Sequence, residues 1–166
     1  MTSGSGAEVS AFVGLGSNLD RPSRQIQRAL RRLENVLDTR ILAVSSLYRS
    51  APFGRAEQPD FVNAVAQLQT RLDAESLLQQ LLSIERAQGR VRGDRWGPRI
   101  IDLDLLVHGD TISNSGELNL PHPGIAERNF VLLPLQEIAP EFVIPGLGKV
   151  ADIAVNRNEP RISRMD

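Results

Sequence analysis

Hydrophobic residues along the chain follow two periods, which together predict six regular elements in the first two thirds of the sequence. Alternation of apolar and polar positions, as around Val62, Ala64 and Ala66, is typical of strands with one buried face. Apolar positions that recur every three or four residues are typical of helices that pack against a core. The predicted strands cover residues 9–15, 40–49, 61–70 and 101–107, and the predicted helices cover residues 21–37 and 73–88.

Boundary residues and the order of these elements indicate a fold. Asp20 and Asp73 precede the two helices as N-cap candidates, and Gly89 follows the second helix, where glycine often ends one. The order strand, helix, strand, strand, helix, strand predicts an α+β fold, a ferredoxin-like βαββαβ sandwich with an antiparallel sheet. Added C-terminal elements are predicted from a polar, hairpin-like segment at 109–117 and an amphipathic stretch at 128–138.

Length and composition predict a single domain. The chain has 166 residues, of which 41% are hydrophobic and 23% charged, and this is enough for one packed core. We expect one domain over residues 1–166, with its core at about 9–150 and polar tails at 1–7 and 156–166, the second of them frayed.

Charge and residue usage argue against several classes of protein. A formal net charge of -1 disfavours proteins that bind nucleic acids or membranes by bulk charge. No apolar run approaches the roughly 20 residues of a membrane span. The chain has no cysteine, which excludes disulfides, thiol catalysis and cysteine-based metal sites and fits a cytoplasmic location.

Asp102 and Asp104 form the first candidate site. Side chains alternate along a strand, so both carboxylates are expected on one face with their Cα atoms about 7 Å apart. Two like charges repel and aspartate is a poor strand former, so the pair favours a divalent cation with oxygen ligands. An ordinary solvent-exposed strand face is the alternative.

The segment just before this pair is rich in arginine and glycine. Residues 89–99 hold four arginines and three glycines, and all basic residues of the chain except Lys149 are arginine. Taken alone, such a segment is a solvated basic loop or an RNA-binding one. Beside two carboxylates, it favours a site for a magnesium polyphosphate, because arginine suits phosphate and carboxylate suits the cation.

His122 and Glu85 are further candidates, each with an ordinary structural alternative. His122 lies between two prolines and could donate a hydrogen bond to an anionic ligand or simply occupy a turn. Glu85 follows Leu81 at helical spacing, so its carboxylate lies beside the apolar stripe and needs a partner. A salt bridge at the edge of the helix would also supply that partner.

Four runs of residues together resemble a known family of enzymes. They are VGLGSN at 13–18, QPDFVNA at 58–64, GRVR at 89–92 followed by RWGPRIIDLD at 95–104, and LPHP at 120–123. In this order they resemble the 6-hydroxymethyl-7,8-dihydropterin pyrophosphokinases of folate biosynthesis, over about residues 9–150. The resemblance implies transfer of pyrophosphate from ATP to the 6-hydroxymethyl group of the dihydropterin with release of AMP. It also implies two Mg²⁺ ions, small-molecule substrates only and a monomer.

The resemblance implies a catalytic role for two groups of residues. The implied catalytic residues are Arg90, Arg92, Arg99, Asp102 and Asp104, and the last two are implied as ligands of both metal ions. Arg90 and Arg92 are expected to contact phosphates, while Arg99 and Trp96 reach the junction of the two substrates.

The resemblance also implies two substrate pockets. The pterin ring would lie between Phe61 and Phe130, and the Asn63 amide would read its edge. The implied pterin-binding residues are Ser50, Ala51, Phe53, Phe61, Asn63, Trp96, Arg99 and Phe130. The implied ATP-binding residues are Leu78, Glu85, Arg90, Arg92, Trp96, Leu105, Leu118, Asn119, His122 and Arg128.

Three departures from the family pattern bear on the nucleotide. Glu117 stands where some members carry a basic residue, Leu82 where some carry glutamine, and Pro123 where some carry tyrosine. None of them touches the aspartate pair or the arginine segment. An RNA-binding module and a different Mg²⁺-dependent nucleotide transferase are the competing functions; the net charge and the seven aromatic residues argue against the first.

Overall fold

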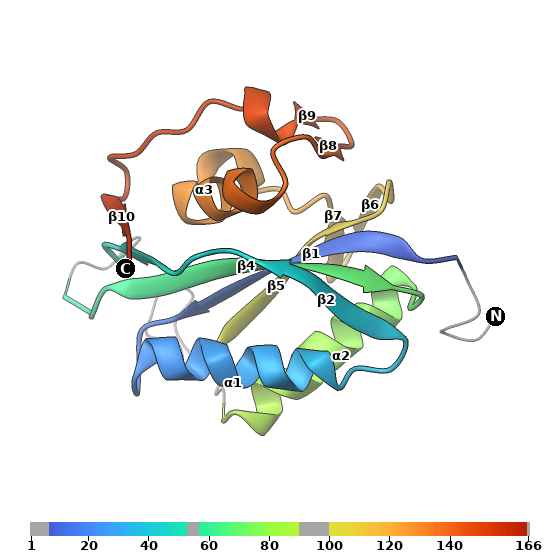
Figure 1. Cartoon of the computed structure of the whole chain (residues 1–166), viewed down its shortest axis with the longest axis horizontal. Coiled ribbons are helices and arrows are strands. Elements are labelled where there is room, and N and C mark those ends of the chain that lie inside the picture. Colours follow the sequence, from blue (N-terminus) through green and yellow to red (C-terminus); the bar gives the residue numbers. More distant parts are fainter. Residues whose placement is uncertain (1–6, 53–56, 90–99, 166) are drawn as a thin grey trace.

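A six-stranded antiparallel sheet lies at the centre of the computed structural model, which describes residues 7–52, 57–89 and 100–165 (Figure 1). The sheet runs in the order β10, β3, β4, β1, β5. The sixth strand, β2, lies on the same side of β4 as β3 and pairs with the C-terminal half of β4. Its strands are β1 (Val9–Ser17), β2 (Thr39–Val44), β3 (Tyr48–Ser50), β4 (Phe61–Thr70), β5 (Asp102–His108) and β10 (Ile162–Arg164). The mixed α/β architecture with an antiparallel sheet agrees with the prediction.

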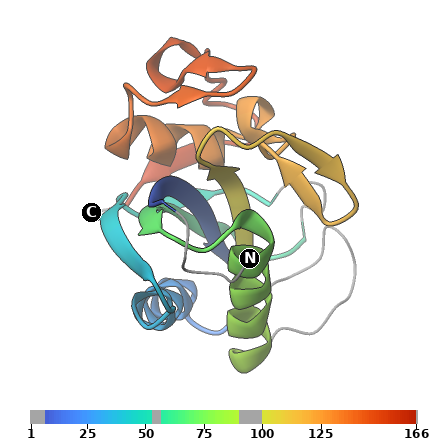
Figure 2. The same cartoon turned by 90° about the vertical axis from the view of Figure 1, so that its right-hand side faces the viewer.

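Helices cover both faces of this sheet (Figure 1 and Figure 2). Helices α1 (Pro22–Glu34) and α2 (Ala74–Ala87) pack on one face, and α3 (Asn129–Ile138) packs on the other. The remaining elements are the hairpin β6 (Ser113–Ser115) and β7 (Leu118–Leu120), the hairpin β8 (Val143–Ile144) and β9 (Gly148–Lys149), and the short 3₁₀ turns η1 (Ile125–Glu127) and η2 (Val150–Asp152). The predicted amphipathic stretch at 128–138 is therefore α3, and the predicted polar hairpin lies at 113–120 rather than 109–117.

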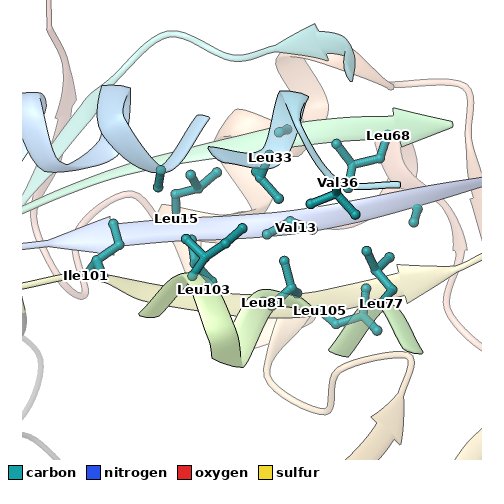
Figure 3. Packing of buried hydrophobic residues seen from close by; sticks show 14 of the residues in the cluster. Val13, Leu15, Leu33, Val36, Leu68, Leu77, Leu81, Ile101, Leu103 and Leu105 are labelled. Carbon is teal, nitrogen blue, oxygen red and sulfur yellow. The ribbon is translucent and has the colours of Figure 1, made fainter. Parts of the chain in front are cut away.

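Two clusters of buried side chains, one on each face, form the core. Figure 3 shows the first cluster, in which Leu33 of α1 and Leu77 and Leu81 of α2 meet Val13 and Leu15 of β1. The second cluster lies under α3 and includes Phe12, Val65, Leu106 and Leu132. Burial of a leucine contributes about 1.5–3 kcal/mol, so the two layers stabilise the sheet from both sides and hold the strands that carry the candidate site.

Only one of the two predicted helix caps is confirmed. The Asp73 carboxylate accepts a hydrogen bond from the backbone N–H of Ser76 at 2.7 Å, as an N-cap residue does. Asp20 is not a cap: the N-cap residue is Arg21, with no side-chain cap, and both residues have left-handed φ values, 52° at Asp20 and 61° at Arg21. The chain turns at these two residues, and the helix starts at Pro22.

The second predicted strand, 40–49, is two strands in the structure. β2 pairs with residues 66–70 of β4, and β3 pairs with residues 61–63. Ser45 lies between the two strands. The backbone N–H of Ser45 donates to Val65 O, and its hydroxyl accepts from the Val65 N–H, both at 2.9 Å. A hydroxyl thus replaces a backbone carbonyl in the ladder, which the alternation of apolar residues does not reveal.

The predicted frayed C-terminal tail is wrong, because part of it forms the edge strand β10. Ile162–Arg164 pairs with β3, the Ala51 N–H donates to Arg161 O at 3.0 Å, and the Met165 N–H donates to Leu47 O at 2.8 Å. The buried Asn129 amide donates to the carbonyls of Asn156 and Pro160, both at 2.7 Å. Long-range pairing, not local pattern, orders this segment.

A carboxylate of α3 connects the same region to the sheet. Glu137 accepts hydrogen bonds from the Tyr48 hydroxyl at 2.7 Å and from the backbone N–H and the hydroxyl of Ser46 at 3.0 Å. Burial raises the pKa of Glu137, but these hydrogen bonds outweigh burial and hold that pKa below its ordinary value. Burial and the hydrogen bond to Glu137 raise the pKa of Tyr48 to about 12.

Candidate active site

The aspartate pair lies opposite two glycines of the neighbouring strand. In the antiparallel register, Asp102 pairs with Gly16 and Asp104 with Gly14, so all four residues share one face of the sheet. Both carboxylate residues are half-buried. Leu103 between them points to the opposite face and is buried in the cluster under α1 and α2. The sequence prediction that both carboxylates share a face is confirmed. Because the residues paired with them on β1 are glycines, no side chain of β1 lies directly opposite either aspartate.

A bulge in β5 ends this stretch. Val13 pairs with Leu105 and Phe12 with Val107, so Leu106 is the extra residue. Beyond the bulge His108 pairs with Ala11 and is buried on the face that α1 and α2 cover, where its Nε2 lies 2.8 Å from Leu72 O. Simple alternation would place His108 on the face of Asp104; the bulge removes it from the site.

Asn63 lies on the same face as the aspartates, one strand further along. It pairs with Gly16 across β1 and β4, and its amide donates to the Ser50 hydroxyl at 3.2 Å. A Cβ at residue 16 would lie only 2.7 Å from Asn63 Oδ1, so this approach requires glycine. Phe61 is two residues before Asn63 on β4 and therefore shares its face.

A cavity of about 330 Å³ adjoins Asp104. It lies between α2, β5 and the β6–β7 hairpin, which projects beside α2 in Figure 2. Its lining residues are Leu78, Leu82, Glu85, Leu103, Asp104, Leu105, Glu117, Leu118, Asn119, Leu120, His122 and Pro123. Six of the residues expected on the ATP side are thus brought together, and leucine side chains and polar groups both line the cavity.

His122 borders this cavity with a defined ring orientation. Its backbone N–H donates to Leu106 O at 2.8 Å, and its Nδ1 accepts from the Gly124 N–H at 3.0 Å. Burial, followed by the charge of Arg128, lowers the pKa of His122 below its ordinary value against the opposing effect of Asp102. The ring is therefore neutral near pH 7, and with Nδ1 accepting, Nε2 carries the proton.

Arg128 is the one expected ATP-side residue among the described ones that does not line the cavity. Its guanidinium packs over Gly124, where a Cβ would lie 2.6 Å from Arg128 Nε. It therefore lies next to the loop that carries His122 and acts on the histidine by its charge.

Glu85 lines the cavity and also supports the aspartate pair. It is buried, and its carboxylate accepts a hydrogen bond from the backbone N–H of Leu103 at 2.7 Å. Because Leu103 lies between the two aspartates, this hydrogen bond fixes β5 against α2 at the point where the carboxylates project. The inward orientation predicted from helical spacing is confirmed.

The other expected residues divide into two sets. Ala51 follows β3, and Phe130 lies half-buried in the first turn of α3, against the cluster on the same side of the sheet as Asn63. The remaining expected residues lie outside the described part of the chain: Phe53, Arg90, Arg92, Trp96 and Arg99.

The described aspartate pair offers two carboxylates side by side and no closed cage of metal ligands. Among residues 7–52, 57–89 and 100–165, no group of three or more acidic or histidine side chains is arranged to hold a metal. Two carboxylates fit Mg²⁺, which keeps several waters and takes further oxygens from substrate phosphates. Sequence reasoning missed Gly14 and Gly16 in this arrangement, because only strand register reveals what faces an aspartate.

The comparisons with known proteins agree on one family. The family model described as 7,8-dihydro-6-hydroxymethylpterin-pyrophosphokinase matches residues 12–140. The 2-amino-4-hydroxy-6-hydroxymethyldihydropteridine pyrophosphokinase of Pseudomonas aeruginosa is 49% identical over 134 residues, which cover 81% of this chain and 83% of that protein. The protein of the same name from Haemophilus influenzae is 44% identical over 137 residues, 82% of this chain and 86% of that one.

Longer proteins contain a similar segment. The folic acid synthesis protein fol1 of Schizosaccharomyces pombe is 40% identical over 135 residues, 81% of this chain but 18% of that protein. A crystal structure of Plasmodium falciparum HPPK-DHPS with pteroate has a TM-score of 0.70 at 15% identity, and the match covers 88% of this chain and 42% of that one. This structural likeness shows a shared fold.

Proposed function

Because the chain belongs to the 7,8-dihydro-6-hydroxymethylpterin-pyrophosphokinase family, we propose that the open sheet face around Asp102 and Asp104 is its active site. The protein is a pyrophosphokinase of folate biosynthesis: it transfers pyrophosphate from ATP to the 6-hydroxymethyl group of the dihydropterin and releases AMP. The observation that carries the site is the pairing of Asp102 and Asp104 with Gly16 and Gly14, beside a cavity of about 330 Å³ that Asp104 also lines.

The aspartates are the metal-binding residues in this proposal. Asp102 and Asp104 would hold two Mg²⁺ ions, and ions bound there would supply positive charge for the triphosphate and a lower pKa for the attacking hydroxyl. Glu85 keeps β5 in place through the Leu103 N–H, so the two carboxylates keep their spacing when the charged substrate binds.

The ATP side of the site is the cavity between α2, β5 and the β6–β7 hairpin. Leu78, Leu105 and Leu118 give the adenine ring an apolar wall, while Asn119 supplies polar groups. Because His122 Nδ1 already accepts a hydrogen bond from the Gly124 N–H, the Nε2–H group is the one that donates a hydrogen bond to a phosphate oxygen. Arg90, Arg92 and Arg128 add positive charge for the phosphates.

The pterin side of the site is the part of the sheet face nearer to β3. Asn63 is held by Ser50, so its amide is presented to the pterin edge in a fixed orientation. Phe61 and Phe130 stack on the two faces of the ring, backbone groups of Ser50, Ala51 and Phe53 complete its recognition, and Trp96 and Arg99 reach the substrate junction.

Further statements about fold, assembly and location belong to this proposal. The core follows the ferredoxin-like βαββαβ plan, supported by the antiparallel strand neighbours β2, β4, β1, β5. The chain acts as one domain, as a monomer, in the cytoplasm and without nucleic-acid or membrane partners. In the described part of the chain no helix has the length and apolar character to cross a membrane.

Release of AMP tests the proposed function directly. Purified protein is incubated with ATP, with and without 6-hydroxymethyl-7,8-dihydropterin, first in Mg²⁺ and then in EDTA. We expect AMP to form only when pterin and metal are both present. Formation of ADP would instead indicate ordinary kinase chemistry, and AMP formation without pterin would exclude the pterin as acceptor.

A further inference from the structure

Asn129 is the buried residue that connects α3 to the C-terminal segment, residues 153–165. It is the first residue of α3 and is 3% exposed. Its side-chain amide donates to Asn156 O and to Pro160 O, both at 2.7 Å. In Figure 1 the C-terminal segment runs from η2 past one end of α3 to β10 at the edge of the sheet. One side chain thus fastens this segment to the helix before the segment reaches the sheet.

The contact at Asn129 is not what stability alone would select. A cavity of about 410 Å³ lies between residues 154–156 and the start of α3, and Asn129 lines it. Asn129 Oδ1 is buried and has no hydrogen-bond partner among the described residues. A buried acceptor without a partner is unfavourable, and an apolar residue of similar shape would avoid this cost. The asparagine therefore fixes the position of the C-terminal segment more than it stabilises the core.

A short turn carries the two anchored carbonyls to β3. Asn156 Oδ1 accepts from the Asn158 N–H at 2.9 Å, and Asn158 forms an antiparallel bridge with Arg161. The carbonyl of Arg161 then accepts from the Ala51 N–H at 3.0 Å, and β10 pairs with the whole of β3. The position that Asn129 gives to the C-terminal segment is therefore passed on to the end of β3.

Both ends of this connection carry residues of the proposed pterin side. At one end, Phe130 directly follows Asn129 and lies half-buried in the first turn of α3. At the other end, the Ser50 hydroxyl accepts the 3.2 Å hydrogen bond that holds the Asn63 amide. Glu137 fastens the opposite end of α3 to β3, so of these two connections the one through Asn129 lies nearer to Phe130.

We propose that Asn129 is a positioning residue for the pterin: through the C-terminal segment, it fixes Phe130 at the distance from Asn63 that a flat ring requires. The inference rests on the proposed function, in which Phe130 and Asn63 contact the pterin. Asn129 acts only through the backbone that it holds. The supporting strand β10 lies beyond residue 140, where the match to the family model ends, so this support comes from a part of the chain outside that match.

Asn129→Leu tests this role, with Asn158→Leu as the matched control. Leucine is near-isosteric and removes both donated hydrogen bonds, whereas Asn158 is an exposed asparagine of the same segment. AMP formation is measured well below the melting temperature, with one substrate varied and the other saturating. For Asn129→Leu we expect KM for the pterin to rise about 10-fold, with KM for ATP and kcat within about twofold of wild type. Its melting temperature should fall by at most about 8 °C, and the control should keep wild-type values.

Truncation adds a readout that a merely structural role would not move. Removing residues 161–166 separates the two anchored carbonyls from β3, so Asn129 can no longer act on β3 through the C-terminal segment. We expect Asn129→Leu to raise KM for the pterin in the full chain and to add nothing to it in the truncated chain. Changes that act independently would instead multiply their effects in such a double-mutant cycle.

The outcomes separate this inference from the proposed function. A wild-type KM for the pterin in Asn129→Leu, or multiplied effects in the truncated chain, would overturn the positioning role and leave the function intact. A lower kcat with both KM values unchanged would do the same, because it indicates only a smaller folded fraction. A wild-type protein that makes no pterin-dependent AMP would overturn both. If Asn129→Leu fails to fold, Asn129→Ala takes its place, and if the truncated chain fails to fold, the difference between the two KM values decides the question.

Discussion

Gly16→Ala is the substitution for which the structure gives the clearest magnitude. The added methyl group would lie 2.7 Å from Asn63 Oδ1, and ordinary contacts begin near 3.4 Å, so the amide must move by about 0.7 Å. Asn63 is held by a 3.2 Å hydrogen bond to the Ser50 hydroxyl, which this movement strains or breaks. Loss of one such hydrogen bond costs about 1 kcal/mol, so the fold survives.

The consequence for catalysis is larger than that for stability. Misplacing a substrate-binding group by about 1 Å reduces activity on the order of 100-fold, so kcat/KM for the pterin should fall about 10- to 100-fold. KM for ATP should stay within about twofold of wild type, because Gly16 does not line the ATP-side cavity. The assay is the initial rate of AMP formation with one substrate varied and the other saturating.

Gly14→Ala is the matched control, two residues earlier on the same strand and face. Its methyl group would meet only the Leu106 side chain, at 3.6–3.8 Å, which is an ordinary contact. Because this methyl group does not approach Asn63, we expect kcat/KM for the pterin to fall less in Gly14→Ala than in Gly16→Ala. An unchanged kcat/KM for the pterin in Gly16→Ala would refute the role given to Asn63, and equal losses in both alanine variants would show that the strand tolerates no side chain there.

Three further predictions concern the metal site, the C-terminal strand and acid stability. Asp104→Ala and Arg99→Ala should each lower turnover at least about 100-fold at saturating Mg²⁺, with circular dichroism unchanged; near-normal turnover in either would remove that residue from the mechanism. Deleting residues 161–166 removes the carbonyl that accepts the Ala51 N–H and should raise KM for the pterin several-fold while KM for ATP is kept, as measured by AMP formation. Because the pKa of Glu137 is lower in the folded protein than its usual 4.5, its ionised form contributes stability above that pH and loses it as the pH falls further. The melting temperature of wild type should therefore exceed that of Glu137→Gln at pH 7, and the difference should shrink as the pH falls below 4.5; a constant difference would contradict the assignment.

Local periodicity predicted the elements whose burial is decided within a few turns. The apolar stripe of α2 with Leu77 and Leu81, and its cap at Asp73, lie where the sequence pattern places them. The strand β10 was missed because its three residues show no alternation and its pairing partner is more than 100 residues away. The face of His108 needed the bulge at Leu106, which is a property of two strands together.

The candidate site was predictable to the same extent. Alternation alone places Asp102 and Asp104 on one face, and helical spacing alone turns Glu85 inward, and the structure confirms both. The partners of these groups were not predictable: the Leu103 N–H that holds Glu85 and the Gly16 that opens the sheet depend on register. The roles of Arg90 and its neighbours rest on family resemblance, since they lie outside the described residues.

The bulge at Leu106 explains why one sheet face carries both a core and a site. Beyond it, Phe12 and Val107 pair under α3, and the face is filled with apolar side chains. Before it, the two aspartates lie opposite glycines, which offer no side chain for a helix to pack on. The aspartate pair therefore stays half-buried at the edge of the layer under α3, and neither aspartate is part of the second cluster. The bulge thus accounts for the position of the site as well as for the packing of α3.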